Sequence, residues 1–259
     1  MISNLNCHVR LDGNMKPGSV LRLLREMMDP AVREHALMAV RNYRKLPDAL
    51  CPGCGYKGRF LAGGTTMRIG ARCPTCGMVE RHRLIALAIQ KKVLSFDGVD
   101  VLHFAPERQV ANIIRKCGPR SYKTADIAEG KADMVLNIEN MDVPDRSFDR
   151  IVCSHVLEHV DDKAALSEMH RVLRKGGYAI LLTPVIEGWE STYETPLART
   201  DKDRVLHYGQ ADHVRYFGAD IRARILGAGF DVSEFTASGE DSATYGLTRG
   251  EKVFIARKA

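Results

Sequence analysis

Long apolar stretches are missing from this sequence of 259 residues. It contains no run of eighteen apolar residues, which a membrane-spanning helix needs, and its N-terminal segment lacks the apolar core of a secretory signal. Collagen-like, low-complexity and intrinsically disordered chains are also excluded, because 45% of the residues are hydrophobic and 27% are charged. The sequence therefore predicts a folded cytoplasmic protein with no membrane partner.

A disulfide framework is lacking as well, since the seven cysteines are odd in number and no export signal accompanies them. Four of them form two Cys-x-x-Cys pairs, Cys51/Cys54 and Cys73/Cys76, which are eighteen residues apart and each followed by glycine. Each pair can turn two sulfurs toward one ion, and the glycine permits the turn. The spacing resembles a zinc ribbon with a closed structural Zn²⁺ site, and favours it over paired redox motifs.

The net charge of +6 is unevenly distributed. Residues 51–98 contain eight basic and two acidic residues, whereas the chain after residue 98 contains 22 basic and 25 acidic ones. A basic ribbon is compatible with binding to the phosphate backbone of RNA. Four thiolates and one Zn²⁺ would lower the charge of the ribbon by about two. The charge therefore leaves RNA as a possible partner without favouring it.

Two short amphipathic helices are expected before the ribbon, between Ser19 and Arg44, with Pro30 opening the second. Their apolar stripes favour a helical cap that packs on the main domain over a lid that gates the substrate. Another helix is expected at residues 79–93, after the ribbon. We therefore expect a helical cap at residues 1–50, the ribbon and a linker helix at 51–98, and the main domain at 99–259.

Short apolar runs alternate with helical stretches throughout the main domain. Strands are expected at 101–104, 122–125, 134–136, 147–153, 178–183, 231–236 and 252–256, and helices at 108–116, 162–174 and 221–226. The longest helix is expected to stop at Lys175-Gly176-Gly177, with glycine as a left-handed C-cap. The alternation predicts an α/β fold with a parallel doubly wound sheet, in which ligands bind at the carboxyl ends of the strands.

The segment from Asn137 to Thr183 carries the most specific pattern in the sequence. It contains Leu-Glu-His-Val at 157–160 and Arg-Val-Leu-Arg-Lys-Gly-Gly at 171–177. These motifs resemble a class I S-adenosylmethionine-dependent methyltransferase of type 11, and the resemblance covers roughly Val99 to Ala259. It implies a Rossmann-like methyltransferase sheet, S-adenosylmethionine as cofactor, and an enzyme that transfers a methyl group.

The resemblance also implies which residues bind the cofactor. Asp126 would accept hydrogen bonds from the two ribose hydroxyls, for which a carboxylate offers two acceptor oxygens. Asn137 and Ile138 would hold the adenine through a side-chain oxygen and a backbone amide. Ser154, at the end of the fourth strand, would lie beside the methionine part of the cofactor.

The first loop departs from the family, because His103-Phe-Ala-Pro-Glu107 replaces the usual glycine-rich stretch and only Ala105 is small. In one interpretation, His103, Ala105 and Glu107 still cradle the cofactor, with Glu107 toward its ammonium or carboxypropyl end. In the other, the cofactor site is lost and the protein is a non-catalytic interaction module. The retained Asp126 and Asn137 favour the first interpretation.

A general base assists methyl transfer to a hydroxyl or an ammonium group, and histidine titrates near neutral pH. We favour His155, which the resemblance places at the end of the fourth strand, between the cofactor and the methyl acceptor. The segment from 192 to 218 occupies the usual place of an acceptor-binding insert. The other candidate bases are His159, His207 and His213, and the acceptor-binding candidates are Tyr193, His207 and Arg215.

The stretch His155-Val-Leu-Glu158-His159 also matches an inverted zinc-protease motif. We regard this match as accidental, because His155 leaves a strand, whereas the protease motif needs both histidines on one helical face. A Mg²⁺ site built from the glutamate and histidine near the fourth strand is a further alternative, although hard cations prefer several oxygen ligands.

Methyl transfer to an oxygen or nitrogen of a small-molecule or saccharide-type acceptor is the function that the sequence favours. The alternative is an RNA methyltransferase that grips RNA with the basic ribbon. Against it, the fourth strand ends in Cys153-Ser-His rather than in an Asn-Pro-Pro-Tyr type of stretch, which many base-directed enzymes use to stack a flipped base.

Overall fold

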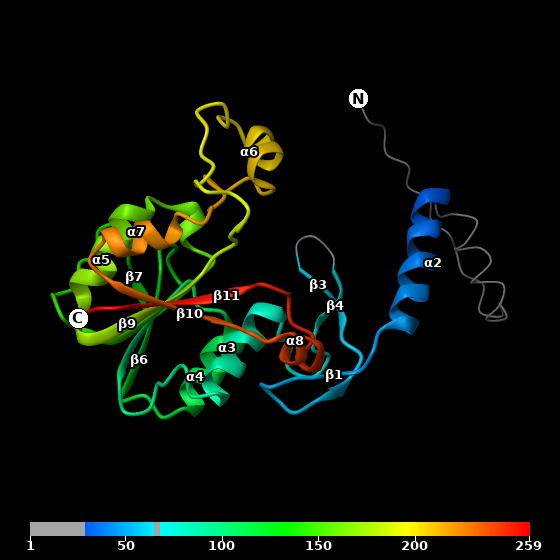
Figure 1. Cartoon of the computed structure of the whole chain (residues 1–259), viewed down its shortest axis with the longest axis horizontal. Coiled ribbons are helices and arrows are strands. Elements are labelled where there is room, and N and C mark those ends of the chain that lie inside the picture. Colours follow the sequence, from blue (N-terminus) through cyan, green and yellow to red (C-terminus); the bar gives the residue numbers. More distant parts are fainter. Residues whose placement is uncertain (1–28, 65–67) are drawn as a thin grey trace. The chain divides into compact units, whose positions relative to one another are not determined.

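The computed structural model describes residues 29–64 and 68–259 (Figure 1). The chain divides into two units, Met1–Leu46 and Pro47–Ala259. The first of the two expected N-terminal helices, which would begin near Ser19, lies outside the described residues. Among the helices in the described ranges, none has the length and apolar character needed to cross a membrane.

Helix α2 (Pro30–Lys45) is the described part of the first unit. Pro30 opens it as expected, and the carboxylate of Asp29 caps it by accepting a hydrogen bond of 2.7 Å from the amide of Ala31. None of its residues is buried, and apolar side chains such as Leu37 are more than half exposed. The role of this segment as a packed cap stays a prediction.

The ribbon begins the second unit and consists of two small antiparallel sheets. Strand β1 (Ala49–Leu50) pairs with β2 (Lys57–Gly58), and β3 (Leu61–Gly63) pairs with β4 (Arg68–Arg72). Helix α3 (Glu80–Gln90) follows, and most of its side chains are buried. The ribbon is therefore continuous with a helix that packs into the core of the main sheet.

The main sheet has seven strands in the spatial order β10-β11-β9-β8-β5-β6-β7. The strands are β5 (Asp100–Phe104), β6 (Ser121–Asp126), β7 (Met134–Val135), β8 (Phe148–Ser154), β9 (Leu173–Leu182), β10 (Asp231–Thr236) and β11 (Lys252–Arg257). The expected doubly wound α/β sheet is confirmed for β5 to β9, which pair in parallel. Strand β11 departs from the parallel arrangement, because it inserts between β9 and β10 and runs antiparallel to both.

Helices cover both faces of this sheet (Figure 1). On one face, α5 (Asp162–Val172) and α7 (Ile221–Gly227) bury side chains in a core shared with the strands. On the other face, α3 and α4 (Arg108–Lys116) form a second core with the opposite sides of the strands. Since the chain reverses its winding direction between β5 and β8, a ligand site is expected at the carboxyl ends of these two strands.

The glycines after α5 serve the sheet rather than the helix end, which corrects the expected C-cap. Helix α5 ends at Val172, and Lys175-Gly176-Gly177 lies inside β9. Gly176 has a φ of 75°, and a Cβ at Gly177 would lie 2.8 Å from the carbonyl oxygen of Asp149 on the neighbouring strand. The irregular pairing at the start of β9 therefore requires glycine.

Two helices were not expected from the sequence. Helix α6 (Asp201–Tyr208) begins at a capping box formed by Thr200 and Asp203, and α8 (Gly239–Tyr245) begins at Ser238. Both are short and end at a left-handed glycine, Gly209 and Gly246 respectively. Helices this short show too little apolar periodicity to be recognised in a polar segment.

A fully buried arginine joins the ribbon to the end of α8. Arg83 of α3 donates hydrogen bonds to the carbonyl oxygens of Ala71 and Met78 in the ribbon, at 2.7 and 2.9 Å. It also donates to the carbonyl oxygens of Tyr245 and Gly246, at 2.9 and 2.5 Å. Its charge has no carboxylate partner within the described part of the chain, so backbone carbonyl groups alone satisfy its donors.

Candidate functional site

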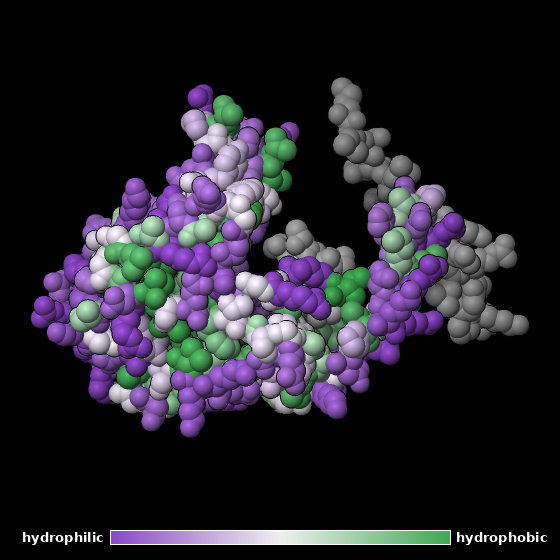
Figure 2. All heavy atoms as spheres, viewed as in Figure 1, coloured by the Kyte–Doolittle hydropathy of each residue, from purple (hydrophilic) through white to green (hydrophobic). Residues whose placement is uncertain are grey.

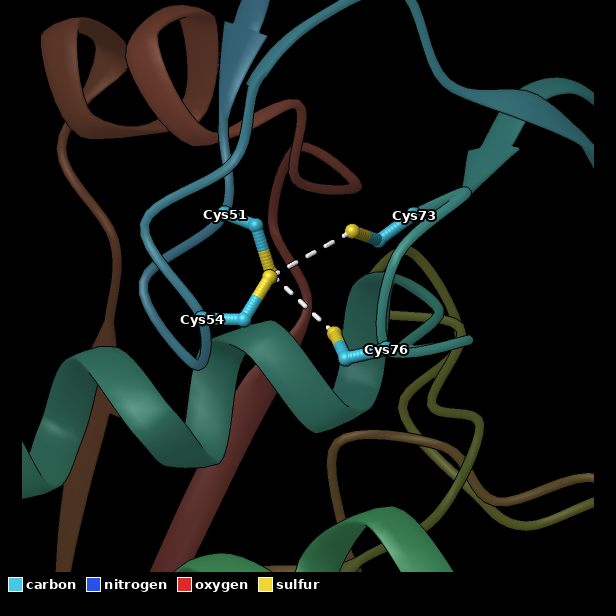
Figure 3. Close-up of side chains that lie close together, drawn as sticks. All are labelled: Cys51, Cys54, Cys73 and Cys76. Carbon is cyan, nitrogen blue, oxygen red and sulfur yellow. Dashed lines mark hydrogen bonds between the residues drawn. The ribbon is translucent and has the colours of Figure 1, made fainter.

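The four ribbon cysteines lie together (Figure 3). Their sulfur atoms all lie within 4.8 Å of one another, with Cys51 and Cys76 at 3.5 Å and Cys54 and Cys73 at 3.7 Å. Four sulfurs bound tetrahedrally to Zn²⁺ at about 2.3 Å lie roughly 3.8 Å apart. The spacing of this donor set therefore fits a Zn²⁺ ion, with no ligand position left for water.

The two cysteine turns share one backbone geometry. In each, the amide of the first cysteine, Cys51 or Cys73, donates to the carbonyl five residues later, at 2.8 and 2.9 Å. The following glycine, Gly55 or Gly77, donates back to the carbonyl of that cysteine, at 2.8 and 3.0 Å. Both glycines have a φ of 76°, which explains why glycine follows each pair.

The loop after β5 makes a left-handed turn at Ala105. This residue has a φ of 43°, and its amide donates to the carbonyl of Ala125 at 2.8 Å. The side chain of His103 is fully buried, with Nδ1 2.7 Å from the hydroxyl of Tyr122. Burial lowers the pKa of His103 to about 4. His103 is therefore held inside the fold, and its contact with the cofactor stays a prediction.

Glu107 is the charged group of this loop, and helix α3 holds it in place. Its Oε1 accepts hydrogen bonds from Arg81 and lies 2.8 Å from Nε2 of His82, while Oε2 accepts from the hydroxyl of Ser154 at 3.3 Å. Burial alone would raise the pKa of Glu107, but His82 and Arg81 bring this pKa down to about 2. An ionised carboxylate thus lies where β5 and β8 end.

The predicted ribose and adenine residues lie at the adjacent strand ends. Asp126 ends β6 and is half-buried, and its carboxylate accepts from the amide two residues later at 2.9 Å. The side-chain oxygen of Asn137 accepts from the amide two residues later at 3.0 Å, so this oxygen already has a partner in its own turn. Ile138 is buried in the core. The amide of Leu136 donates to the carbonyl of Asp126 at 3.0 Å, which fixes the two segments side by side.

His155 follows β8 directly, with a φ of 55° and an amide that donates to the carbonyl of Leu182 at 2.7 Å. Its Nδ1 lies 3.0 Å from Oε1 of Glu158, and Oε2 of this glutamate accepts from the hydroxyl of Thr183 at 2.9 Å. Burial alone would raise the pKa of Glu158. The hydrogen bond to His155 and the electrostatic attraction of this histidine instead lower the pKa of Glu158 below its ordinary value. When Nδ1 donates to this carboxylate, Nε2 of His155 is free to accept a proton.

The structure brings the predicted bases His159 and His213 to the same glutamate. Their ring centroids are 4.7 Å apart, and one ligand atom from each histidine and from Glu158 lies within 4.8 Å of the others. Both carboxylate oxygens of Glu158 already accept hydrogen bonds, from His155 and Thr183. One engaged carboxylate and two imidazoles do not fit Mg²⁺, which prefers several oxygen ligands.

A cavity of about 510 Å³ opens beside His155. Its lining includes Arg68 of the ribbon and Glu80 and Arg81 of α3. Residues 248–252, which lead into β11 and include its first residue, also line it. None of these groups was among the site residues predicted from the sequence. Arg68 and Arg81 belong to the basic segment noted above, but their place in this cavity depends on contacts between distant parts of the chain.

The three predicted acceptor-binding residues lie outside the lining of this cavity. The hydroxyl of Tyr193 is 2.8 Å from Nδ1 of His207. Arg215 is buried, donates to the carbonyl of Leu157 at 3.0 Å and lies 3.1 Å from the carboxylate of Asp162, so it anchors the insert. Its role in acceptor binding stays a prediction, and other parts of the same segment line the cavity.

Apolar side chains are exposed on the segment that carries α6 (Figure 2). Leu197, Val205 and Leu206 have exposed fractions of 67%, 51% and 80%. None of them belongs to the cavity lining. From this segment, the cavity is instead lined by Gly209, Gln210 and Tyr216.

The family model of a methyltransferase domain matches residues 112–181, which include β6 to β8, α5 and most of β9. This stretch of the chain carries a methyltransferase domain. Among curated proteins, none matches the chain.

Several solved structures are similar to this chain at low sequence identity. The YcgJ protein from Bacillus subtilis is 14% identical with a TM-score of 0.48, over 69% of this chain and 99% of its own. A SAM-dependent methyltransferase from Archaeoglobus fulgidus is 16% identical with a TM-score of 0.46, over 68% and 94%. The 1,6-didemethyltoxoflavin-N1-methyltransferase from Burkholderia thailandensis is 14% identical with a TM-score of 0.47, over 96% and 93%. Similarities at this level do not define the methyl acceptor.

Proposed function

We propose that the protein transfers a methyl group from S-adenosylmethionine to an oxygen or nitrogen of a small-molecule or saccharide-type acceptor. The observation that carries this proposal is the pair of His155 and Glu158 at the end of β8, where His155 lines a cavity of about 510 Å³. A cavity of this size suits a small ligand. The same strand end lies beside the ionised Glu107 of the cofactor loop, through Ser154.

S-adenosylmethionine, when bound, supplies an electrophilic methyl group on its sulfonium sulfur. Asp126 and Glu107 would hold its ribose hydroxyls and its ammonium group, because both offer carboxylate oxygens at adjacent strand ends. Nε2 of His155 would accept the proton that the acceptor hydroxyl or amine loses. The Glu158 carboxylate would then stabilise the imidazolium, as it already orients Nδ1. Alignment of the acceptor in the cavity supplies a large part of the rate.

We also propose that the four ribbon cysteines hold a structural Zn²⁺ ion. The sulfur spacing and the two matching turns support this assignment. With four protein ligands, the ion would fix the ribbon and the start of α3, whose Arg81 and His82 hold Glu107. The role of the ion would thus be to position the cofactor loop rather than to activate water.

An RNA acceptor is less well supported by the ribbon. Several of its basic side chains are already paired with carboxylates, among them Arg68 with Glu80 at 2.9 Å and Lys91 with Asp241 at 3.0 Å. Pairs of this kind reduce the positive charge available to a phosphate backbone. Salt-dependent retention of RNA by the purified protein would instead favour the RNA alternative.

The variant His155→Gln tests the proposed base. We expect its turnover to fall by roughly 10²- to 10⁴-fold, because the proton acceptor is lost. Turnover is followed by label transfer from S-adenosylmethionine in an unbiased screen of acceptors. The affinity for S-adenosylhomocysteine, measured by calorimetry, should stay near that of the wild type. The matched control is His35→Gln, on the exposed helix α2. Loss of cofactor binding with unchanged single-turnover chemistry would contradict the assignment.

A further inference from the structure

The cavity beside His155 has an excess of positive side chains in its lining. The lining has four basic residues and two acidic ones. The basic residues are Arg68, Arg81, Arg249 and Lys252, and the acidic residues are Glu80 and Glu251. Three of the four cations lie within 3.3 Å of a carboxylate oxygen. Arg249 forms no ion pair with any residue in the ranges 29–64 and 68–259. One cation of the lining is therefore available to a ligand.

Glu251 contributes a buried oxygen atom that lacks a partner. Its Oε2 is inaccessible to solvent and makes no hydrogen bond within the described part of the chain. Because this atom is inaccessible, it lies inside the cavity wall and does not itself contact a ligand. Burial raises the pKa of Glu251, which reduces the repulsion that this carboxyl would exert on an anion in the cavity.

The ribbon forms one wall of this cavity. Arg68 of β4 donates two hydrogen bonds to the carboxylate of Glu80, at 3.0 and 2.9 Å, and both residues belong to the lining. Arg81, one residue further along α3, is held by Glu107 of the cofactor loop. These ion pairs fix the wall, and they connect it to the loop that would bind the cofactor.

We propose that this cavity binds a methyl acceptor that carries a carboxylate or a phosphate, and that Arg249 binds this anionic group. The proposal rests on the proposed function, because it identifies the acceptor of the same site. His155 belongs to the same lining, so an acceptor anchored by its anion presents a hydroxyl or amine to the base. The ribbon then takes part in acceptor recognition as a wall of the site.

Matched monosaccharides test the proposal. The full-length, zinc-loaded protein, saturated with S-adenosylhomocysteine, is titrated by calorimetry with glucose 1-phosphate, with glucuronate and with uncharged glucose. We expect at least one anionic sugar to bind roughly tenfold more tightly than glucose, because a charge-assisted hydrogen bond is added. Tighter binding of only one of them identifies the phosphate or the carboxylate as the recognised anion. Binding of neither in preference to glucose overturns the proposal.

Two variants separate the cavity from the general surface charge. Arg249→Gln should abolish the preference for the anionic sugar, while the affinity for S-adenosylhomocysteine stays unchanged. Arg59→Gln removes the same charge from an exposed ribbon position outside the cavity and should leave the preference intact. Equal loss in both variants would attribute the preference to the surface charge and overturn the proposal. Failure of S-adenosylhomocysteine to bind at all would instead refute the proposed function, which distinguishes the two failures.

Discussion

The contact between Glu107 and helix α3 can be tested by replacing one atom of the carboxylate. In Glu107→Gln the side chain keeps its shape but loses its charge, and with it the attraction to Arg81 and His82. If the contact has the strength that the structure indicates, the variant should be less stable than the wild type at neutral pH. The loss should shrink in acid, where the wild-type carboxylate also becomes neutral.

The magnitude follows from the pKa of Glu107, which is about 2 in place of the ordinary value of 4.5. Each pKa unit corresponds to about 1.4 kcal/mol, so the ionised carboxylate contributes up to about 3 kcal/mol to the free energy of unfolding. The side chain is only 18% exposed, which limits screening by solvent. A lowered carboxyl pKa stabilises the fold above pH 4.5, and this contribution is lost as the pH falls toward 2. Roughly half of it should be lost by about pH 3.

Urea denaturation followed by circular dichroism measures the difference in unfolding free energy between Glu107→Gln and the wild type at each pH. We expect a difference of about 2 to 3 kcal/mol at pH 7 and a clearly smaller one near pH 3. The control is Glu129→Gln, an exposed position without an ion pair in the described residues, which should show no such difference. A difference that is the same at both pH values would refute the reasoning.

Two further changes test the ribbon and its attachment. Arg83→Met should lower the free energy of unfolding by about 3 kcal/mol or more, because two buried and two partly buried carbonyl groups lose their donor. Arg59→Met, which is exposed, should have little effect in the same urea denaturation, and a similar small effect at Arg83 would contradict the inferred attachment. Native mass spectrometry should find one zinc ion per wild-type chain and per Cys117→Ser chain, but none in Cys54→Ser. Zinc retained in Cys54→Ser would exclude a site that needs all four ribbon cysteines.

The sequence predicted the elements that have a strong local pattern. Helix α4 and strand β10 have the expected bounds, because each shows clear periodicity between turn residues. The cysteine turns were also predictable, since four ligands and two glycines lie at fixed spacings. The end of α5 was predicted wrongly, because Gly176 and Gly177 satisfy both a helix cap and an irregular strand, and only the pairing of β9 with β8 decides between them.

Long-range partners account for what the sequence did not show about the site. An arginine in a polar insert is equally consistent with ligand binding and with anchoring, and the partner of Arg215, Asp162, lies 53 residues before it. The same holds for Glu107, since its partner Arg81 is 26 residues away. The histidines, by contrast, indicated from the sequence where polar groups cluster. Three of the predicted bases, His155, His159 and His213, lie around the buried Glu158.

The replacement of the glycine-rich loop and the presence of the ribbon have a common physical explanation. A glycine loop holds a cofactor by close approach of its backbone, whereas Glu107 offers a charge that must be kept in position. Helix α3 meets this requirement, because Arg81 and His82 in its first turn hold one carboxylate oxygen. The ribbon in turn fixes the start of α3, since Arg83 binds carbonyl groups in the ribbon and after α8. A metal ion in the ribbon would therefore stabilise the same residues on which the cofactor loop depends.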